Sequence, residues 1–303
     1  MKIFMTGGTG FVGTTLTREL TAKGHSVTVL MRKVELGQSL PAGANSLEGD
    51  PTIRGSWQQR VPEHEAFINL AGSSIFTRWT DETKRSIRES RILTTKHLVE
   101  AMAPRKGKET VLFSTSAVGY YGFHGDEELG EDSPPGTDFL ATLAREWEAE
   151  AVKAKEYGVR VVLTRFGIVM GRNGGMLGEV VPIFRKFLGA NLGSGDQWLS
   201  WVHEQDLARI FLTLLDTRAL EGPLNCTAPE PVRNREFTET LGSVLGVPTF
   251  LPPVPGFILQ LMKGEFGSVI LKGQRVLPRR LLAAGFQFLY PTLKEALTEI
   301  LRK

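Results

Sequence analysis

Along the N-terminal half of the chain, short apolar runs alternate with longer stretches in which apolar side chains recur every three or four positions. The apolar runs predict buried strands at residues 2–5, 25–31, 66–70, 110–114 and 159–164, with a weaker strand at 46–49. The stretches between them predict helices at residues 11–23, 81–102 and 140–157. In the first helix Leu16 and Leu20 have the helical spacing, and Gly24 ends it. We therefore expect an α/β fold with a parallel sheet covered by helices on both faces.

The alternation weakens after about Gly171, where Gly and Pro become frequent. We predict a doubly wound α/β domain at residues 1–172. Residues 201–231 are expected to return to its sheet as a helix and a strand. Residues 173–200 and 232–303 are predicted to form a smaller cap that holds the substrate.

Composition narrows the function class. Of the 303 residues 41% are hydrophobic and 23% charged, which is ordinary for a globular protein, and the net charge of +3 comes from dispersed residues, so no nucleic-acid partner is expected. No apolar run approaches the roughly 18 residues of a membrane span, and Gly7 follows the start too soon for a secretory leader. We expect a cytoplasmic protein with a small-molecule substrate and no membrane partner, and the choice between monomer and homodimer stays open.

The single cysteine, Cys226, excludes an intramolecular disulfide and a cysteine-based metal site, and we predict no metal. It lies on the predicted strand 223–227, so we expect a buried and inert thiol.

The first chemical motif follows the first predicted strand. Gly7, Gly10 and Gly13 stand in a G-x-x-G-x-x-G spacing that opens the first helix. Glycine lets the backbone turn tightly and lets a pyrophosphate approach the amides of the helix N-terminus. A Gly-rich turn without a ligand is the alternative, but the strand and helix on either side favour dinucleotide binding. We therefore predict that residues 1–172 form a dinucleotide-binding domain of the Rossmann type. We expect Gly10→Glu or Gly13→Val to abolish binding and to leave the protein folded.

The end of the second strand indicates which dinucleotide is bound. An enzyme that uses NAD usually has an acidic residue there for the ribose hydroxyls, whereas this chain has Met31, Arg32 and Lys33. Arginine can pair with a 2′-phosphate, so NADP(H) is favoured. A solvated Arg-Lys pair at the start of a loop is the alternative.

The chain resembles an extended or atypical short-chain dehydrogenase/reductase of the nucleotide-sugar-epimerase-like branch. Beyond the glycine turn, the resemblance rests on Glu48-Gly49-Asp50, Asn69-Leu70-Ala71-Gly72, Phe113-Ser114-Thr115-Ser116-Ala117, Arg165-Phe166-Gly167 and Trp201-Val202-His203 with Asp206-Leu207. Arg78-Trp79, Ser90-Arg91, Trp147-Glu148 and Gly273-Gln274-Arg275 are similar to an NAD(P)-binding "epimerase family" subgroup with its own C-terminal domain.

The resemblance implies a cofactor site along the carboxyl ends of the strands, where ligands of open α/β sheets bind. We also include Arg91 among the predicted cofactor-binding residues. It lies with Lys84 and Arg88 on one basic face of a predicted helix that begins beside the cofactor loop, where it can reach a phosphate. The predicted cofactor-binding residues are Gly7, Thr9, Gly10, Phe11, Val12, Gly13, Met31, Arg32, Lys33, Asp50, Leu70, Ala71, Gly72, Arg91, Ser114 and Phe166.

The chain departs from the family at the proton relay. The family uses a Tyr-x-x-x-Lys pair on the helix after the serine strand, in which the lysine lowers the tyrosine pKa. Alignment of this helix places Phe139 and Leu143 at those positions, and neither transfers a proton. Tyr290 and Lys294 do have the spacing, but Pro291 separates them and they lie near the C-terminus, so we treat the match as coincidence.

Three residues remain as catalytic candidates. Ser116 matches the family's active-site serine, and because it follows the apolar strand we expect its hydroxyl to project at the sheet edge where the nicotinamide lies. Tyr121 follows it on the next loop, and His203 has a suitable intrinsic pKa. Packing is the alternative for Tyr121, and for His203 we prefer a structural role that joins the cap to the sheet.

The sequence therefore predicts an NADP-binding oxidoreductase or epimerase that acts on an unidentified small molecule. Two alternatives stay open: a non-catalytic NADPH-binding regulator, and a nucleotide-sugar epimerase with a substitute acid or base.

Overall fold

The computed structural model describes residues 1–33, 40–172 and 174–302. Its centre is a parallel sheet of seven strands in the order β11-β7-β5-β4-β1-β2-β3. The strands are β1 (Lys2–Thr6), β2 (Ser26–Met31), β3 (Ala44–Glu48), β4 (Ala66–Asn69), β5 (Val111–Ala117), β7 (Arg160–Phe166) and β11 (Gly222–Cys226). This order reverses direction between β1 and β4, which is the position where such sheets bind their ligands.

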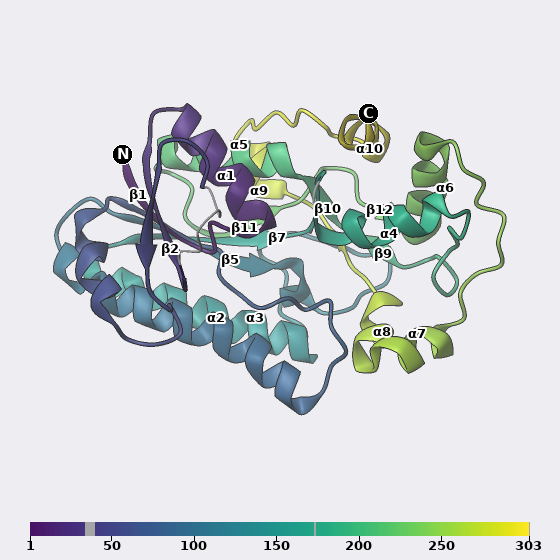
Figure 1. Cartoon of the computed structure of the whole chain (residues 1–303), viewed down its shortest axis with the longest axis horizontal. Helices are drawn as coiled ribbons and strands as arrows, with labels where there is room; N and C mark the ends of the chain where they lie inside the picture. The colour runs from purple at the N-terminus through teal and green to yellow at the C-terminus, as the bar shows by residue number, and fades with distance from the viewer. Residues whose placement is uncertain (34–39, 173, 303) are drawn as a thin grey trace.

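Helices cover both faces of the sheet (Figure 1). On one face lie α1 (Phe11–Ala22) and α5 (Glu204–Asp216), and on the other lie α2 (Asp81–Ala101) and α3 (Phe139–Val152). The strands supply both cores, because successive side chains point to opposite faces: Ile3 and Met5 pack toward α1 and α5, and Phe4 packs toward α2. Short 3-10 turns complete this part, at η1 (Ser56–Glu63), η2 (Ala103–Arg105), η3 (Val118–Tyr121) and η4 (Lys153–Tyr157).

Side-chain caps fix the starts of two helices that border the candidate site. Thr80 accepts a hydrogen bond from the Thr83 backbone N–H at the start of α2. Asp138 accepts hydrogen bonds from the backbone N–H groups of Leu140 and Ala141 at the start of α3, at 2.9 and 3.2 Å. Each cap satisfies donors that the helix itself leaves unpaired.

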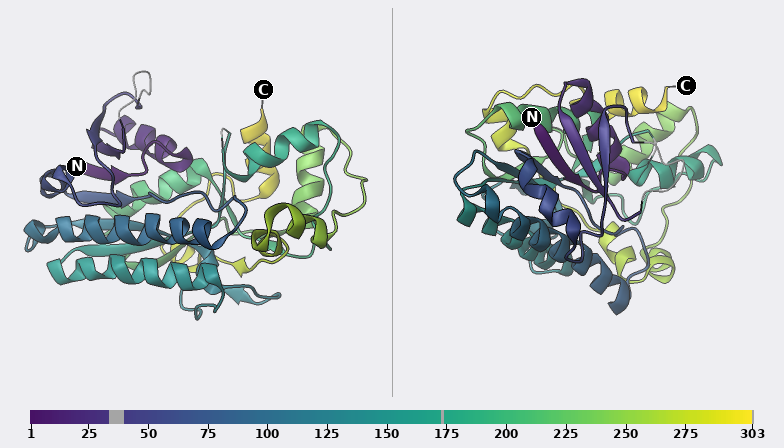
Figure 2. Two further views of the ribbon diagram at one scale, coloured as in Figure 1. Left: turned by 60° about the horizontal axis from the view of Figure 1, so that its bottom comes forward. Right: turned by 60° about the vertical axis from the view of Figure 1, so that its left-hand side comes forward.

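Five further helices gather at one end of the sheet, as Figure 2 shows. They are α4 (Gly175–Arg185), α6 (Asn234–Leu245), α7 (Gly256–Lys263), α8 (Glu265–Ile270) and α10 (Leu293–Leu301). Phe184, Phe237 and Leu297 belong to a separate apolar cluster there. Short strand pairs join this cap to the sheet: β8 (Ile168–Met170) with β10 (Trp201–His203), β9 (Trp198–Leu199) with β12 (Val232–Arg233), and β6 (Glu128–Leu129) with β13 (Arg275–Val276).

The predicted α/β class and all seven strands are confirmed. Within residues 201–231, β11 pairs with β7 in the sheet and α5 packs on its face. Two boundaries differ by three residues or more: β5 continues to Ala117, and the helix predicted to reach residue 157 ends at Val152 and tightens into η4. The other predicted strand and helix boundaries differ from the observed ones by at most two residues. A longer segment also differs. The helix α9 (Arg279–Ala283) lies within the region predicted as cap, yet Leu281 and Phe286 are buried in the core of the sheet. The exact division into domains stays a prediction.

In the described part of the chain, no helix combines the length and the apolar character that a membrane crossing requires.

Candidate functional site

The glycine turn between β1 and α1 is closed so tightly that side chains are excluded from parts of it. Gly7 has a φ of 71°, and a Cβ there would lie 2.8 Å from the Ala71 backbone N. A Cβ on Gly13 would lie 2.2 Å from the Gly7 carbonyl oxygen. This geometry argues against the expectation that Gly13→Val leaves the protein folded, because the side chain would collide with the backbone of the turn itself.

Gly10 is different, and it marks the open side of the turn. A Cβ there would meet only the Gly7 carbonyl oxygen, at 3.3 Å. Gly10 is also the N-cap of α1, with no side-chain cap and no acidic residue in the first turn of the helix. The first amides of α1 thus have no acceptor from a capping side chain, and the helix dipole favours an anion beside them. This cradle of backbone amides fits the pyrophosphate of a dinucleotide.

The loop after β4 lies directly against this turn. The Leu70 N–H donates to the Thr6 carbonyl at 3.1 Å, and the Thr6 hydroxyl donates to Asn69 Oδ1 at 2.7 Å. Asn69 Nδ2 in turn donates to Thr95 Oγ1 on α2 at 2.7 Å. Leu70 and Ala71 are thereby held beside the glycine turn. That these residues and Gly72 bind the cofactor stays a prediction.

Arg91 of α2 reaches under the same loop. Its Nη1 donates to the carbonyls of Ser73 at 3.1 Å and Ile87 at 3.0 Å. Gly72 makes room for it, since a Cβ there would lie 2.9 Å from Arg91 Cζ. Burial lowers the pKa of Arg91 to about 10, so the guanidinium stays charged at neutral pH.

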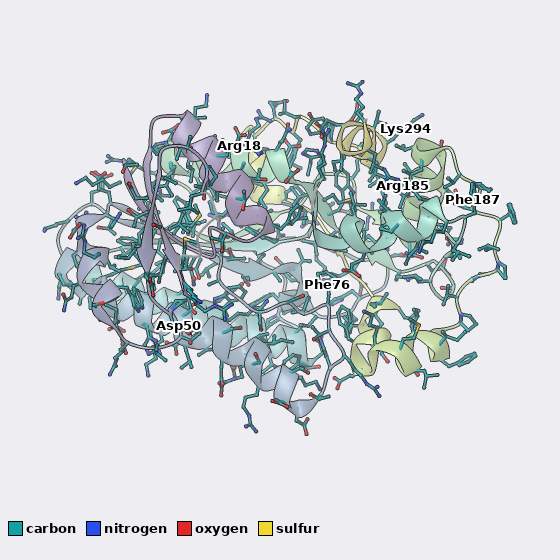
Figure 3. The ribbon with its side chains drawn as sticks, viewed as in Figure 1. Arg18, Asp50, Phe76, Arg185, Phe187 and Lys294 are labelled. Carbon is teal, nitrogen blue, oxygen red and sulfur yellow. The ribbon has the colours of Figure 1, made fainter. Side chains whose placement is uncertain are left out.

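At the end of β2 the predicted residues divide into two groups. Met31 is buried in the core and can offer a ligand only its backbone, whereas Arg32 and Lys33 are exposed. Asp50, beyond β3, accepts hydrogen bonds from the N–H and hydroxyl of Thr52 at 2.8 and 2.6 Å (its place is labelled in Figure 3). Arg32 thus combines the charge and the exposure that a 2′-phosphate contact requires.

Ser116 ends up inside the protein, not at the sheet edge where its hydroxyl was expected. It is 1% exposed, and its Oγ donates to Glu148 Oε1 of α3 at 2.7 Å. Arg165, which pairs with Ser116 across β5 and β7, donates to both oxygens of Glu148 at 2.8 and 2.9 Å. The hydroxyl therefore points toward the α3 face, where the carboxylate of Glu148 accepts it. Whether Ser116 is catalytic stays a prediction.

Tyr121 extends this buried network toward β11. Its hydroxyl accepts from Arg165 Nη1 at 2.9 Å and donates to Asn225 Oδ1 at 2.7 Å. Burial raises the pKa of Tyr121 to about 12. The phenol is therefore neutral at physiological pH with its proton held by Asn225.

His203 lies between α5 and α10 with its ring fully buried. Its Nδ1 accepts from the Gln205 N–H at 3.0 Å, and its Nε2 lies 3.1 Å from Glu299 Oε2 of α10. Burial lowers the pKa of His203, although Glu299 works in the opposite direction. These contacts join the cap to the helices of the sheet, as expected for the structural alternative.

Tyr290 and Lys294 belong to that same junction. The Tyr290 ring stacks on His203 with centroids 4.1 Å apart, and its hydroxyl donates to Gln205 at 3.3 Å. Lys294 is exposed on α10, as Figure 3 shows. These contacts agree with the prediction that the Tyr290–Lys294 spacing is coincidental.

The two positions of the missing relay, Phe139 and Leu143, are filled by apolar packing. The Phe139 ring meets Trp79 edge to face at 5.1 Å, and Leu143, 5% exposed, belongs to a cluster with Trp79 and Phe266 of α8. Phe76, labelled in Figure 3, adds a second aromatic contact to Phe266, at 5.8 Å. This junction ties the start of α3 to the cap.

Two further predicted cofactor residues lie in the strands. Ser114 is buried, and its hydroxyl has no partner among the described residues. Phe166 is half-buried and packs edge-on against Phe211 at 6.0 Å.

Sequence reasoning missed Glu148 and Asn225 as parts of the site. Glu148 was noticed only within the Trp147-Glu148 motif. The missed signal is an acidic residue on an otherwise apolar helix face, between Ala144 and Ala151. Acidic residues are rarely buried unless they are paired. The partner here, Arg165, belongs to the Arg165-Phe166-Gly167 motif.

A cavity of about 520 Å³ opens beside the N-terminus of α1, lined by Thr9, Gly10, Phe11, Thr14, Thr15, Arg18, Arg172, Glu204, Gln205 and Glu299. It contains three of the predicted cofactor residues, Thr9, Gly10 and Phe11, and none of the catalytic candidates. Phe11 forms its wall toward the cap, because a Cβ on Gly174 would lie 2.8 Å from the Phe11 ring.

Cys226 is fully buried at the end of β11, as predicted, and burial raises its thiol pKa. Within the described ranges, no three His, Cys, Asp or Glu side chains are grouped to hold a metal ion.

A seven-stranded parallel sheet with a glycine turn at an uncapped helix start defines a dinucleotide-binding protein of the Rossmann class. Comparison with family models gives a match over residues 3–226 to the NAD dependent epimerase/dehydratase family, and a second match over residues 254–300 to a domain of unknown function (DUF1731). The chain belongs to the NAD-dependent epimerase/dehydratase family. The resemblance drawn from the motifs, including the separate C-terminal domain, is confirmed.

Several relatives match over nearly the whole chain. The Arabidopsis thaliana "Epimerase family protein SDR39U1 homolog, chloroplastic" is 42% identical over 100% of this chain and 87% of its own length. YfhF of Bacillus subtilis is 38% identical over 99% of this chain and 98% of its own. The crystal structure of human SDR39U1 (isoform 2) with NADPH is 34% identical, with a TM-score of 0.86 and 99% of both chains covered. A UDP-glucose 4-epimerase from Thermus thermophilus, 21% identical with a TM-score of 0.78 over 98% and 97% of the two chains, shares the fold.

Proposed function

We propose that this protein binds NADP(H) at the edge formed by the glycine turn and the loop after β4. We further propose that it exchanges hydride with a small molecule held between that edge and the cap. The observation that carries the proposal is the intact cradle at Gly10, open on the ligand side and closed everywhere else. The similar human protein crystallised with NADPH supports the choice of cofactor.

The chain's own residues have separable parts in this proposal. The first amides of α1 receive the pyrophosphate, Arg32 and Lys33 receive the 2′-phosphate, and Leu70 to Gly72 border the ligand along the sheet edge. When bound, the nicotinamide ring supplies or accepts the hydride.

Ser116 is our candidate for polarising a substrate oxygen. Its hydroxyl donates to Glu148, so it serves a substrate only after it turns away. Glu148 does not lose its partner when this happens, because Arg165 still bonds both carboxylate oxygens. Tyr121 and His203 have positioning roles in this proposal. Tyr121 extends the hydrogen-bond network to β11, and His203 joins α5 to α10.

A non-catalytic NADPH-binding regulator is the second candidate function. The apolar packing of Phe139 and Leu143 favours it, because the family's acid-base positions have become part of a domain junction. A regulator and a hydride-transfer enzyme predict the same cofactor affinity, so turnover must distinguish them.

The test begins with mass spectrometry of small molecules that co-purify with the protein. NADPH absorbance is then followed with those molecules and with a panel of carbonyl compounds and nucleotide sugars. The oxidoreductase proposal expects turnover that falls about 10²- to 10³-fold in Ser116→Ala, with unchanged NADPH affinity. Tyr290→Phe and Lys294→Ala serve as controls and should leave turnover nearly intact. Absence of turnover with every substrate, together with tight NADPH binding, would support the regulator.

A further inference from the structure

Arg91 is a half-buried cation for which the described residues supply no negative partner. Among the described residues, its Nη1 donates two hydrogen bonds, and both acceptors are neutral carbonyl oxygens, those of Ser73 and Ile87. No carboxylate among the described residues lies within 4.0 Å of its guanidinium. A charge taken out of water without compensation is costly, so such groups in proteins are normally paired or bind an anion.

The surroundings of Arg91 are built to hold the guanidinium in place. On one side Gly72 admits it, since any larger residue would approach Cζ to 2.9 Å. On the other side Trp147 of α3 lies under it, with Cζ 5.3 Å from the ring centroid. The Trp147 indole is itself fixed, because its Nε1 donates to Thr95 Oγ1 at 2.8 Å.

The location connects Arg91 to the dinucleotide edge. The loop over Arg91 is the one whose preceding residues, Leu70 and Ala71, touch Gly7 of the phosphate-binding turn. Leu143, one helical turn before Trp147, stands at the position aligned with the family's lysine. A cation from α2 therefore lies close to the part of α3 where the family's cation is missing.

We propose that the free edge of the Arg91 guanidinium, its Nε and Nη2 groups, binds a phosphoryl group of the ligand at this edge of the sheet. A planar guanidinium offers parallel N–H donors that match a phosphoryl group, which a lysine ammonium does not. Two sources share this chemistry: the phosphates of the dinucleotide and a phosphate carried by the substrate. The inference rests on the proposed function in that it places the ligand along residues 70–73.

The variants are Arg91→Met, which keeps much of the apolar stem against Trp147, and Arg91→Lys, which keeps the charge without the fork. Arg88→Met is the matched control, because Arg88 lies one turn earlier on α2 and pairs at the surface with Glu146, 2.6 Å away. Circular dichroism and melting temperature first establish that each variant is folded.

Affinities are then measured by titration calorimetry for NADPH, for NADH and for inorganic pyrophosphate added to the NADPH-saturated protein. Arg91→Met should weaken its phosphate ligand about tenfold to a hundredfold, Arg91→Lys should recover only part of the loss, and Arg88→Met should match the wild type. Loss for NADPH and NADH alike assigns Arg91 to the pyrophosphate, loss for NADPH alone to the 2′-phosphate, and loss for inorganic pyrophosphate alone to a substrate phosphate.

Affinities of Arg91→Met within twofold of the wild type for all three ligands would overturn the proposal. If wild-type protein binds no dinucleotide, the proposed function fails instead. Pyrophosphate binding to the protein without cofactor then tests Arg91 alone: a loss in Arg91→Met supports the proposal, and unchanged or absent binding overturns it.

Discussion

The two halves of the candidate site, the glycine turn and the start of α3, differ in whether side chains fill them. Around Gly7, Gly10 and Gly13 the chain leaves out side chains, and backbone amides remain available to a ligand. At the start of α3 the chain adds side chains, and Phe139 and Leu143 fill the space against the cap. The difference teaches that cofactor binding and acid-base chemistry occupy separate elements of this fold, so one can be lost while the other is kept.

The polar side chains of the second half are also buried. Ser116, Tyr121 and Arg165 donate to one another or to Glu148 and Asn225 in a network with almost no exposure to solvent. Such a network stabilises one arrangement of β5, β7 and β11 and makes each member expensive to remove. The binding half is built from backbone groups and the other half from buried side chains. Substitutions in the two halves should therefore have different effects.

The largest effect is expected within the glycine turn itself. Gly13→Val places a side chain within 2.2 Å of the Gly7 oxygen, so the turn must open, and the protein should lose several degrees of melting temperature or fail to accumulate. Gly10→Glu points into open space and should keep native circular dichroism and nearly native melting. Equal stability of the two variants would contradict the geometry of the turn.

Breaking the buried pair is the next largest change. Glu148→Ala removes the carboxylate that pairs with Arg165 and accepts from Arg165 Nε and Nη2 and from the Ser116 hydroxyl, which should cost about 3–5 kcal/mol in the free energy of unfolding. Glu146→Ala on the same helix removes only the exposed pair with Arg88 and should cost about 0–1 kcal/mol. Urea unfolding of both variants tests this, and a similar cost for the two would show that Glu148 is not buried as a paired charge.

A smaller effect is expected on the preference between the two cofactors, and it should be confined to the binding half. Arg32→Ala should remove most of the preference for NADPH over NADH, about 1.5–3 kcal/mol or about tenfold to a hundredfold in affinity. Fluorescence titration with both cofactors measures it. A wild-type protein that binds the two equally would rule out the role of Arg32.

The smallest effect concerns pH and the His203 junction. Burial holds the pKa of His203 in the folded state below 6.5, so below that pH the unfolded chain takes up a proton that the folded chain resists. The stability contributed by neutral His203 is therefore complete above about pH 6.5 and is lost as pH falls toward the folded-state pKa. Relative to wild type, His203→Gln should show a flatter decline of unfolding free energy below pH 6.5, and comparison with wild type removes the contribution of His64, whose pKa burial also lowers. A parallel decline in the two proteins would show that His203 titrates normally.

The sequence predicted the strand, turn and helix of the binding half well because their signals are local. A strand, a glycine spacing and a helix start within thirteen residues define the turn, and Cys226 could be assigned to the core from its strand alone. The neighbours of Gly13 were not predictable in detail, since the collision involves a carbonyl six residues earlier.

The other half depends on contacts between distant segments, which a periodicity cannot reveal. The expected outward direction of Ser116 failed because Glu148, 32 residues later, accepts its hydroxyl. The packing of Leu281 on the sheet was missed because the segment contains Gly and Pro that indicated a cap. In each case tertiary packing decided the outcome.

The central claim is that an intact phosphate-binding half works without the relay of the other half. Calorimetric titration of NADPH into wild-type protein, Gly10→Glu and Ser116→Ala tests it most directly, with circular dichroism to establish that all three are folded. The account predicts saturable binding by the wild type, the same affinity within about twofold for Ser116→Ala, and no measurable binding by Gly10→Glu, whose carboxylate enters the pyrophosphate space. Unchanged affinity in a folded Gly10→Glu, or no binding by the wild type, would contradict it.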